Sequence, residues 1–457
     1  MRLGVLASHP IQYQAPWFRA LAKALELQVF FCHRQSAGEQ GKAGFGVAFD
    51  WDVDLLAGYQ NRFVKNVSTR PGVNRFSGCD TPEIGEIISG MRDAESEKQM
   101  HLTPALSPER RGSGAINSQL STLNSFTRFD AFIVFGWHLK AYWQAARACR
   151  RAGVPVLVRG DSQLHTPRSF LKRWAKEILY RPLLRQFDGF LVVGKRNREY
   201  LAHYGVPERK LFFAPHFVDN EWFGGKAEIA RKQKAEIRKE WGADEQTLVA
   251  LFVGKFQAIK RPRDLLRALA VMDINREGRV TRVPNNSARD SCNSSLRNVM
   301  AVFVGSGELE KVLRAEATAL GVRAHFAGFK NQSELPRYYA AADVLVLPSE
   351  NETWGLVVNE AMACGLPAIV SEAVGCAPDL IEPERTGFTF PVGDVERLAG
   401  CLSTLELRRR AGHDFSVALR EKAAAYSVEA AVAGTLAAMK SFIPGNFAAG
   451  KAGAISP

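Results

Sequence analysis

The stretch Asp343–Val370 reads DVLVLPSENETWGLVVNEAMACGLPAIV and indicates the fold class by itself. The apolar run Val344–Leu347 predicts a strand buried on both faces, and the polar residues after it predict a loop. A helix is expected to open near Gly355 and to end at Gly365–Pro367, before a second buried strand at Ala368–Val370. A strand, a helix and another strand in this order are typical of a parallel α/β sheet.

The same alternation runs outward from this stretch through both halves of the chain. In the first half we expect strands at Leu3–Ala7, Leu27–Phe31, Ala131–Phe135, Val154–Val158 and Gly189–Val193. In the second half we expect them at Leu248–Val253, Val299–Val304, Ala324–Ala327, Val344–Leu347 and Ala368–Val370. Helical patterns lie between several of these runs, so the sequence predicts two doubly wound parallel sheets.

Length and composition agree with two domains. The 457 residues are 46% hydrophobic and 23% charged, as in ordinary globular proteins. We predict a first domain over residues 1–223, a second over 224–427, a helix over 428–442 that returns to the first domain, and a tail over 443–457. Two polar stretches without periodicity, 95–124 and 275–298, are interpreted as disordered insertions.

Several classes of protein are disfavoured by the sequence. No apolar run reaches the roughly 18–20 residues that cross a bilayer, and the start of the chain lacks the pattern of a signal peptide. The seven cysteines are dispersed and never spaced as Cys-x-x-Cys, which indicates neither a disulfide framework nor a zinc site. We therefore expect a cytoplasmic protein.

More than half of the formal net charge of +13 lies in one region, because Arg159–Lys210 holds 12 Lys and Arg residues against five acidic ones. Within it, residues 168–186 interleave basic with large apolar side chains. Two interpretations stay open: a peripheral surface that contacts an anionic membrane at its inner face, or a domain helix with a solvated basic face. A nucleic-acid partner is not expected, because the chain has no nucleic-acid recognition module.

Two glutamates and a helix N-terminus carry the chemistry of the opening stretch. The N-terminus of the helix presents free backbone N–H groups, and Gly355 would let a phosphate approach the backbone closely. Glu352 and Glu360 would be about 12 Å apart if the interval were helical, which is longer than the spacing of a glycosidase carboxyl pair. We interpret the two glutamates as holding two parts of one elongated ligand. The alternative interpretation is that both are solvated surface residues.

A second candidate element follows the predicted strand Leu248–Val253. Lys255 and Lys260 lie five residues apart in a loop before a helix at Asp264–Ala270. Two cations at this position would neutralise the charge on a departing diphosphate. Two solvated lysines are the alternative interpretation.

These elements together resemble a known family. The frame S-x-x-E-T-W-G-L-x-x-x-E-A-M-A-x-G-x-P over residues 349–367 is similar to the signature of retaining GT-B glycosyltransferases of family 4. The resemblance implies that Glu360 binds the ribose hydroxyls of a nucleotide and that Glu352 contacts the donor sugar. It also implies that the backbone near Gly355 and Leu356 binds diphosphate and sugar, and that Trp354 replaces the family's usual Phe as an aromatic wall.

The resemblance extends to other predicted site residues. It implies that Lys255, in place of the family's Arg, and Lys260 stabilise the leaving diphosphate, and that Phe329 and Lys330 line the slot for the nucleobase. In the first half it implies that His138 is the active-site histidine. On the acceptor or sugar side we expect two further residues at strand ends, His9 and Asp161.

The expected fold is therefore GT-B, with two Rossmann-like domains that face a central cleft. The resemblance implies retaining transfer of a sugar from a UDP- or GDP-linked donor to a glycan, lipid or small-molecule acceptor, without a metal or further cofactor. Cell-envelope polysaccharide synthesis is the expected setting. Two alternatives stay open: a nucleotide-sugar epimerase on the same fold, and a non-catalytic scaffold that binds sugar nucleotides.

Overall fold

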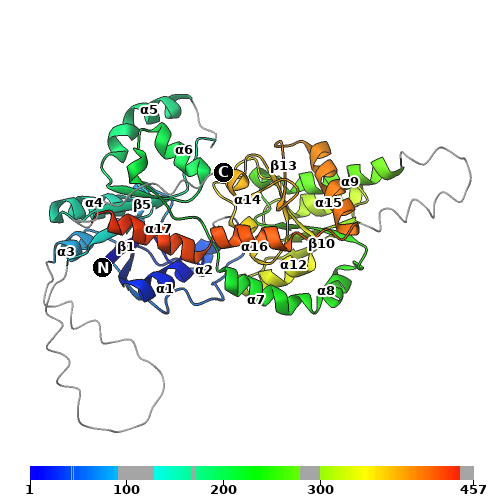
Figure 1. The fold of residues 1–457 in the computed structure, drawn as a ribbon, viewed down its shortest axis with the longest axis horizontal. Helices are drawn as coiled ribbons and strands as arrows, with labels where there is room; N and C mark the ends of the chain where they lie inside the picture. Colours follow the sequence, from blue (N-terminus) through cyan, green and yellow to red (C-terminus); the bar gives the residue numbers. More distant parts are fainter. Residues whose placement is uncertain (43, 45, 91–127, 166–169, 278–298, 443–457) are drawn as a thin grey trace, which may run out of the picture.

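The computed structural model describes residues 1–42, 44, 46–90, 128–165, 170–277 and 299–442 (Figure 1). The predicted insertion 95–124, most of the predicted insertion 275–298 and the tail 443–457 lie outside these residues. Residues 275–277 are the end of helix α9 (Pro262–Glu277), which extends beyond the predicted Asp264–Ala270.

The first lobe is built on a parallel sheet of seven strands. In the order of pairing they are β3 (Gln60–Phe63), β2 (Glu26–Phe31), β1 (Arg2–Ala7), β4 (Ala131–Val134), β5 (Val156–Gly160), β6 (Gly189–Val192) and β7 (Leu211–Phe213). Alternate strand residues point to opposite faces and pack into two separate cores. Helices cover both faces, which is the arrangement of a doubly wound sheet.

The helices of the first lobe divide between these faces. One face carries α3 (Glu83–Ser89), α4 (Lys140–Ala152), α5 (Phe170–Leu184) and α6 (Lys195–His203). The opposite face carries α1 (Ala15–Ala24) and α17 (Val428–Lys440), and the short α2 (Ala37–Lys42) follows β2.

The second lobe repeats the plan with six parallel strands. In the order of pairing they are β10 (Ala324–Gly328), β9 (Val299–Val304), β8 (Leu248–Val253), β11 (Val344–Leu347), β12 (Ala368–Ser371) and β13 (Gly387–Phe390). One face is covered by α7 (Asn220–Arg231), α8 (Lys234–Trp241), α12 (Leu335–Ala341), α13 (Leu356–Ala363), α14 (Ala377–Leu380) and α16 (Ser416–Ala425). The other is covered by α9, α11 (Glu310–Ala319) and α15 (Val395–Arg410). The predicted pair of doubly wound sheets is confirmed.

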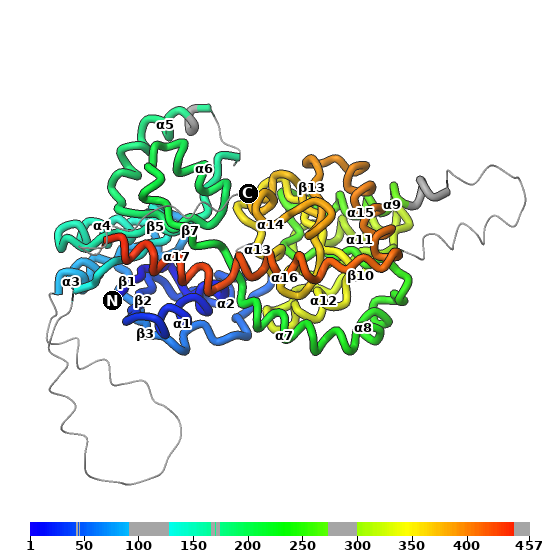
Figure 2. Tube along the Cα trace, in the orientation of Figure 1, coloured from blue at the N-terminus to red at the C-terminus, as the bar shows by residue number. Residues whose placement is uncertain are grey.

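The last helix joins the two lobes. Helix α17 begins at the N-cap Ser427, whose side chain accepts a hydrogen bond from the Ala430 N–H, and it lies beside α1 and β7 of the first lobe (Figure 2). A side chain at Gly434 would collide with the Phe213 carbonyl oxygen, so glycine lets this helix approach β7 closely.

The division into domains at residues 223 and 224 falls inside helix α7. Phe223 is fully buried in the core of the second lobe, together with Ala227 and Val249. We therefore propose to place the domain boundary before Asn220, where α7 begins.

The strand order fixes where a ligand site can form. The order reverses between β1 and β4 in the first sheet and between β8 and β11 in the second. Loops at such reversals diverge and leave a crevice at the carboxyl ends of the strands. The loops after β1, β4, β8 and β11 contain most of the predicted site residues.

Candidate functional site

An ion pair joins two of the predicted site residues. Lys260 ends a short 3₁₀ helix (Ala258–Lys260) after β8, and its ammonium group contacts the carboxylate of Glu352, which lies in the loop after β11. The two side chains are 21% and 18% exposed, so solvent still reaches both groups. Each charge therefore neutralises the other while no ligand is bound.

Lys255 lies near this pair. Burial is the largest cause that lowers the pKa of Lys255. The positive charge of Lys260 lowers this pKa further, and the negative charge of Glu352 opposes both effects. The two predicted cations are therefore close enough to act on one ligand group.

The second glutamate, Glu360, is fully buried inside α13. The Tyr13 hydroxyl of the first lobe donates a hydrogen bond of 2.8 Å to its Oε1, and the Tyr339 hydroxyl donates to its Oε2. Burial raises the pKa of Glu360 to about 7, although both hydrogen bonds favour the charged form. This carboxyl group, predicted to bind ribose, is thus held by tyrosines from both lobes.

The N-terminus of α13 has the backbone geometry that the sequence predicts. Gly355 precedes the helix with φ of 99°, a left-handed conformation that favours glycine, and a Cβ there would lie 3.1 Å from Leu347 and from Val374. Leu356 is the first helical residue, so its N–H group lacks a partner within the helix.

Trp354 lies between the lobes rather than against an open cavity. Its side chain is 4% exposed, donates from Nε1 to Asn359 and packs on His216 and Tyr426. A Cβ at Gly194 of the first lobe would overlap its ring. The predicted aromatic wall thus forms part of the contact between lobes.

A cavity of about 110 Å³ lies between the lobes beside Glu360. Both residues predicted for the nucleobase slot, Phe329 and Lys330, line it. The ammonium group of Lys330 also pairs with Glu334 at 3.1 Å. The first lobe contributes Tyr13 and two further lining residues, Gln12 and Trp51.

The other predicted residues lie on the first lobe. His9 follows β1 and lines a larger cavity of about 460 Å³. Burial and the nearby His33 lower its pKa to about 4, so its ring is neutral at pH 7, and Ser8 Oγ lies 2.9 Å from its Nδ1. His138 follows β4 and contacts Tyr142 edge-on, and an electrostatic interaction couples it to Asp161 after β5.

Several contacts of the site were not predicted. Gln163 is 1% exposed and donates from Nε2 to the Glu352 carbonyl oxygen at 2.9 Å, which ties the loop after β5 to the Glu352 loop. Tyr13 lies four residues after His9 beyond the end of β1, and a polar aromatic residue at that place is a signal for it. Tyr339 lies in α12, a short helix whose residues are mostly buried, and gives no comparable signal.

Comparison with known families agrees with this geometry. The model for glycosyl transferases group 1 matches residues 233–424, and the model for glycosyltransferase family 4 matches residues 88–222. The chain belongs to the glycosyl transferases group 1 family. The resemblance stated from the sequence is thereby confirmed.

Curated glycosyltransferases and a sulfoquinovosyl transferase match parts of this chain. A D-inositol 3-phosphate glycosyltransferase of Geodermatophilus obscurus is 32% identical over 180 residues, which are 38% of this chain and 35% of that protein. The sulfoquinovosyl transferase SQD2 of Arabidopsis thaliana is 35% identical over 216 residues, 47% of this chain and 36% of that protein. The matched region is thus little more than a third of each relative.

Solved structures resemble this group 1 chain over nearly its whole length. Anabaena HepE in complex with UDP and glucose gives a TM-score of 0.61 at 16% identity, covering 96% of this chain and 100% of that one. The apo form of the lipopolysaccharide outer core galactosyltransferase WaaB gives 0.58 at 14% identity, covering 97% and 100%. At these identities the likeness shows the fold, which is GT-B.

Proposed function

We propose that this protein transfers a sugar from a uridine diphosphate sugar to a hydroxyl group of an acceptor, with retention at the anomeric carbon. The observation that carries the proposal is the Lys260–Glu352 ion pair, which lies where the order of the second sheet reverses. Family membership supports the activity. The choice of UDP over GDP is supported by HepE, which was solved with UDP and glucose.

In this proposal the ion pair opens when the donor binds. Lys260 and Lys255 turn to the diphosphate, together with the N-terminal N–H groups of α13. Glu352 is then free to accept hydrogen bonds from the sugar hydroxyls, and Glu360 from the ribose. Positive groups positioned before the reaction stabilise the charge that develops on the diphosphate as the bond to the sugar breaks.

The acceptor is proposed to enter from the first lobe. The cavity beside His9 is the larger of the two described above and lies at the carboxyl ends of β1 and β2. Its neutral imidazole is able to hydrogen-bond an acceptor hydroxyl. His138 and Asp161 would face the donor sugar from the neighbouring strand ends.

A panel of sugar nucleotides tests this function. We expect UDP sugars to raise the melting temperature of the full chain more than GDP or ADP sugars, and the best ligand to be consumed only when a suitable acceptor is present. Binding without turnover for every acceptor in a glycan and lipid library would support the scaffold alternative. Formation of an epimerised sugar without any acceptor would support the epimerase.

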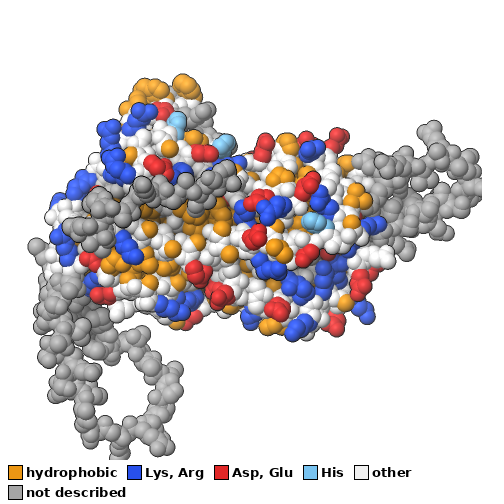
Figure 3. Space-filling view, in the orientation of Figure 1, with side chains coloured by type: hydrophobic (Ala, Val, Ile, Leu, Met, Phe, Trp, Pro, Cys, Tyr) orange, Lys and Arg blue, Asp and Glu red, His pale blue; other side chains and the backbone are white. Residues whose placement is uncertain are grey.

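We further propose that helix α5 contacts an anionic membrane. Phe170, Trp174 and Ile178 lie four residues apart on one face and are 79%, 60% and 52% exposed, and Leu179 beside them is 59% exposed. Figure 3 shows hydrophobic surface at the tip of the molecule over α5, with Lys and Arg side chains on its flank. A domain helix with a solvated basic face would instead bury these apolar side chains.

Large apolar side chains beside basic ones are the pattern of a helix that lies in a membrane interface. Of the helices in the described ranges, none is long and apolar enough to cross a bilayer. The proposed contact is therefore peripheral, and it would bring the enzyme to a membrane-associated acceptor.

Vesicle sedimentation tests the role of α5. We expect the full chain to bind vesicles containing 30% phosphatidylglycerol and to bind neutral vesicles more weakly. A double change of Trp174 and Ile178 to Ser should lower binding at least tenfold, because each buried side chain contributes about 1.5–3 kcal/mol. The matched control replaces Ile229 and Leu407, which are 65% and 69% exposed on the other lobe. Equal losses in both double variants would contradict the proposal.

A further inference from the structure

A short segment of the first lobe is hydrogen-bonded to the second lobe beside the cavity of about 110 Å³. The Asp50 carbonyl oxygen accepts a hydrogen bond of 2.7 Å from the Asn331 side chain, and the Asp52 carboxylate accepts one from the Ser333 backbone N–H. Residues 50–52 and residues 331–333 therefore run alongside each other, with Trp51 and Gln332 at the middle of the two segments. We call this pairing the interlobe clasp.

Aromatic packing reinforces the clasp. The rings of Phe49 and Trp51 meet edge-on at 5.0 Å, and Phe49 also packs on Phe329 with ring centroids 4.5 Å apart. Trp51, Phe329 and Gln332 all line the cavity of about 110 Å³. The first lobe thus supplies one aromatic wall of the cavity, and the second lobe supplies another.

Gln332 lines this cavity, and its side chain carries a hydrogen-bonding atom that is not used. The residue is 7% exposed, and its Oε1 is buried without a hydrogen-bond partner among the residues that the structure describes. An acceptor buried without a donor loses its hydrogen bonds to water, so such groups normally have a partner in the protein. A ligand with an N–H group inside the cavity would supply the missing donor.

We propose that Gln332 hydrogen-bonds the Watson–Crick edge of the donor's uracil ring, accepting from its N3–H, while Trp51 closes over the ring from the first lobe. This inference rests on the proposed function, which places a uridine nucleotide in the cavity. Its apolar walls, Val253, Val304, Leu335 and Val357, would contact the faces of the base. Selection of the base then requires both lobes, because the clasp holds Trp51 in place only when the lobes are closed.

Calorimetric titration of the full chain with UDP and with N3-methyl-UDP tests the pairing. The methyl group removes the single N–H donor of uracil, so we expect the wild-type protein to bind N3-methyl-UDP about tenfold more weakly. Gln332→Leu should weaken UDP binding by about the same factor and should bind both nucleotides equally. Trp51→Ala should weaken both nucleotides about tenfold and keep their ratio, because stacking does not depend on N3.

Gln60→Leu, an exposed glutamine on edge strand β3, serves as the matched control and should bind both nucleotides like the wild type. If the wild-type protein binds UDP and N3-methyl-UDP with equal affinity, the inference is overturned, and no variant is needed to show it. If Gln332→Leu still binds N3-methyl-UDP more weakly than UDP, the inference is also overturned, because another group would then be the one that meets N3. If the wild-type protein neither binds UDP nor consumes UDP sugars, the proposed function itself fails.

Discussion

Lys260→Ala is expected to lower the turnover number for sugar transfer by about 10²–10³-fold. Removing one preorganised group that stabilises developing negative charge has an effect of this size. In the described part of the chain the Lys260 ammonium pairs with a carboxylate that solvent also reaches, so its removal should disturb the fold little. The loss should therefore appear in catalysis at saturating donor and leave the melting temperature within a few degrees of the wild type.

The measurement is initial-rate kinetics with donor and acceptor both varied. Lys311→Ala is the matched control, because Lys311 is an exposed lysine on α11 of the same lobe, and we expect its turnover to be unchanged. Turnover of Lys260→Ala within threefold of the wild type would show that the ion pair is only structural. The proposed diphosphate clamp would then be wrong.

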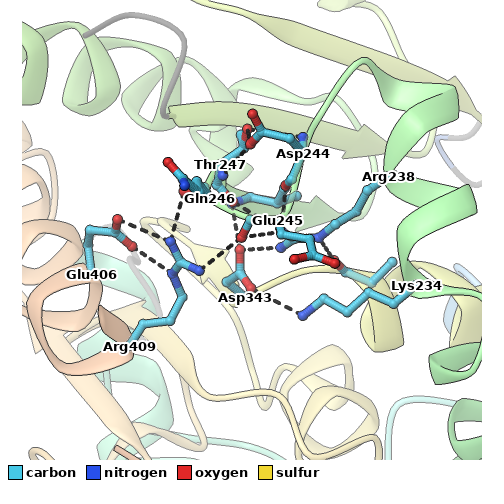
Figure 4. A network of polar contacts seen from close by, with 11 residues as sticks. Lys234, Arg238, Asp244, Glu245, Gln246, Thr247, Asp343, Glu406 and Arg409 are labelled. Carbon is cyan, nitrogen blue, oxygen red and sulfur yellow. Dashed lines mark hydrogen bonds and ion pairs between the residues drawn. The ribbon is translucent and has the colours of Figure 1, made fainter. Parts of the chain in front are cut away.

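The second large effect concerns stability. Arg238 on α8 is 2% exposed, and its guanidinium donates to the carbonyl oxygens of Ala341 and Thr247 and pairs with the Asp343 carboxylate (Figure 4). Lys234 also contacts Asp343, and Asp343 accepts from the Val249 N–H at 2.9 Å. This network lies where β8 and β11 begin, at the edge of the sheet opposite the candidate site.

Arg238→Ala is expected to lower the free energy of unfolding of the second lobe by about 3–5 kcal/mol. The change leaves the buried Asp343 carboxylate without its main partner, and uncompensated buried charges have effects of this size. Urea unfolding followed by tryptophan fluorescence measures it. Lys239→Ala on the exposed side of the same helix should change stability by less than about 0.5 kcal/mol.

A double variant separates the lost ion pair from other causes. Replacing Arg238 by Met and Asp343 by Leu removes both charges, so most of the lost stability should return. If the double variant is no more stable than Arg238→Ala, the loss comes from packing or from the carbonyl hydrogen bonds. That outcome would contradict the electrostatic explanation.

The buried strands were predictable because parallel strands covered on both faces are almost wholly apolar. Strands β3, β7 and β13 were missed. Strand β3 has the polar sequence QNRF, β7 has three residues, and β13 is only half buried, and all three lie at the edges of their sheets. An edge strand pairs on one side only, so its residues carry a weaker apolar pattern than those of a central strand.

The site was predictable as a set of loops but not as a set of contacts. The ends of the predicted strands indicated which loops carry the candidate residues, and these loops lie at the carboxyl ends of the two sheets. The partners of these residues come from distant parts of the chain: Lys260 is 92 residues from Glu352, and Tyr13 is 347 residues from Glu360. Local pattern cannot assign such pairs, because they depend on how the two lobes close. The roles of these residues stay predictions until variants are measured.

The hydrogen bond from Tyr13 to Glu360 has a consequence for turnover. If Glu360 binds ribose, the empty enzyme carries its own competitor for that carboxyl group, tethered at high effective concentration by the first lobe. An incoming donor would compete with the Tyr13 hydroxyl for this carboxyl group, which would weaken the apparent affinity of the donor. After each reaction the Tyr13 hydroxyl would bind Glu360 again and so help to expel the spent nucleotide. The Tyr13 hydroxyl would thereby speed release of the nucleotide product, a step that limits turnover in many enzymes.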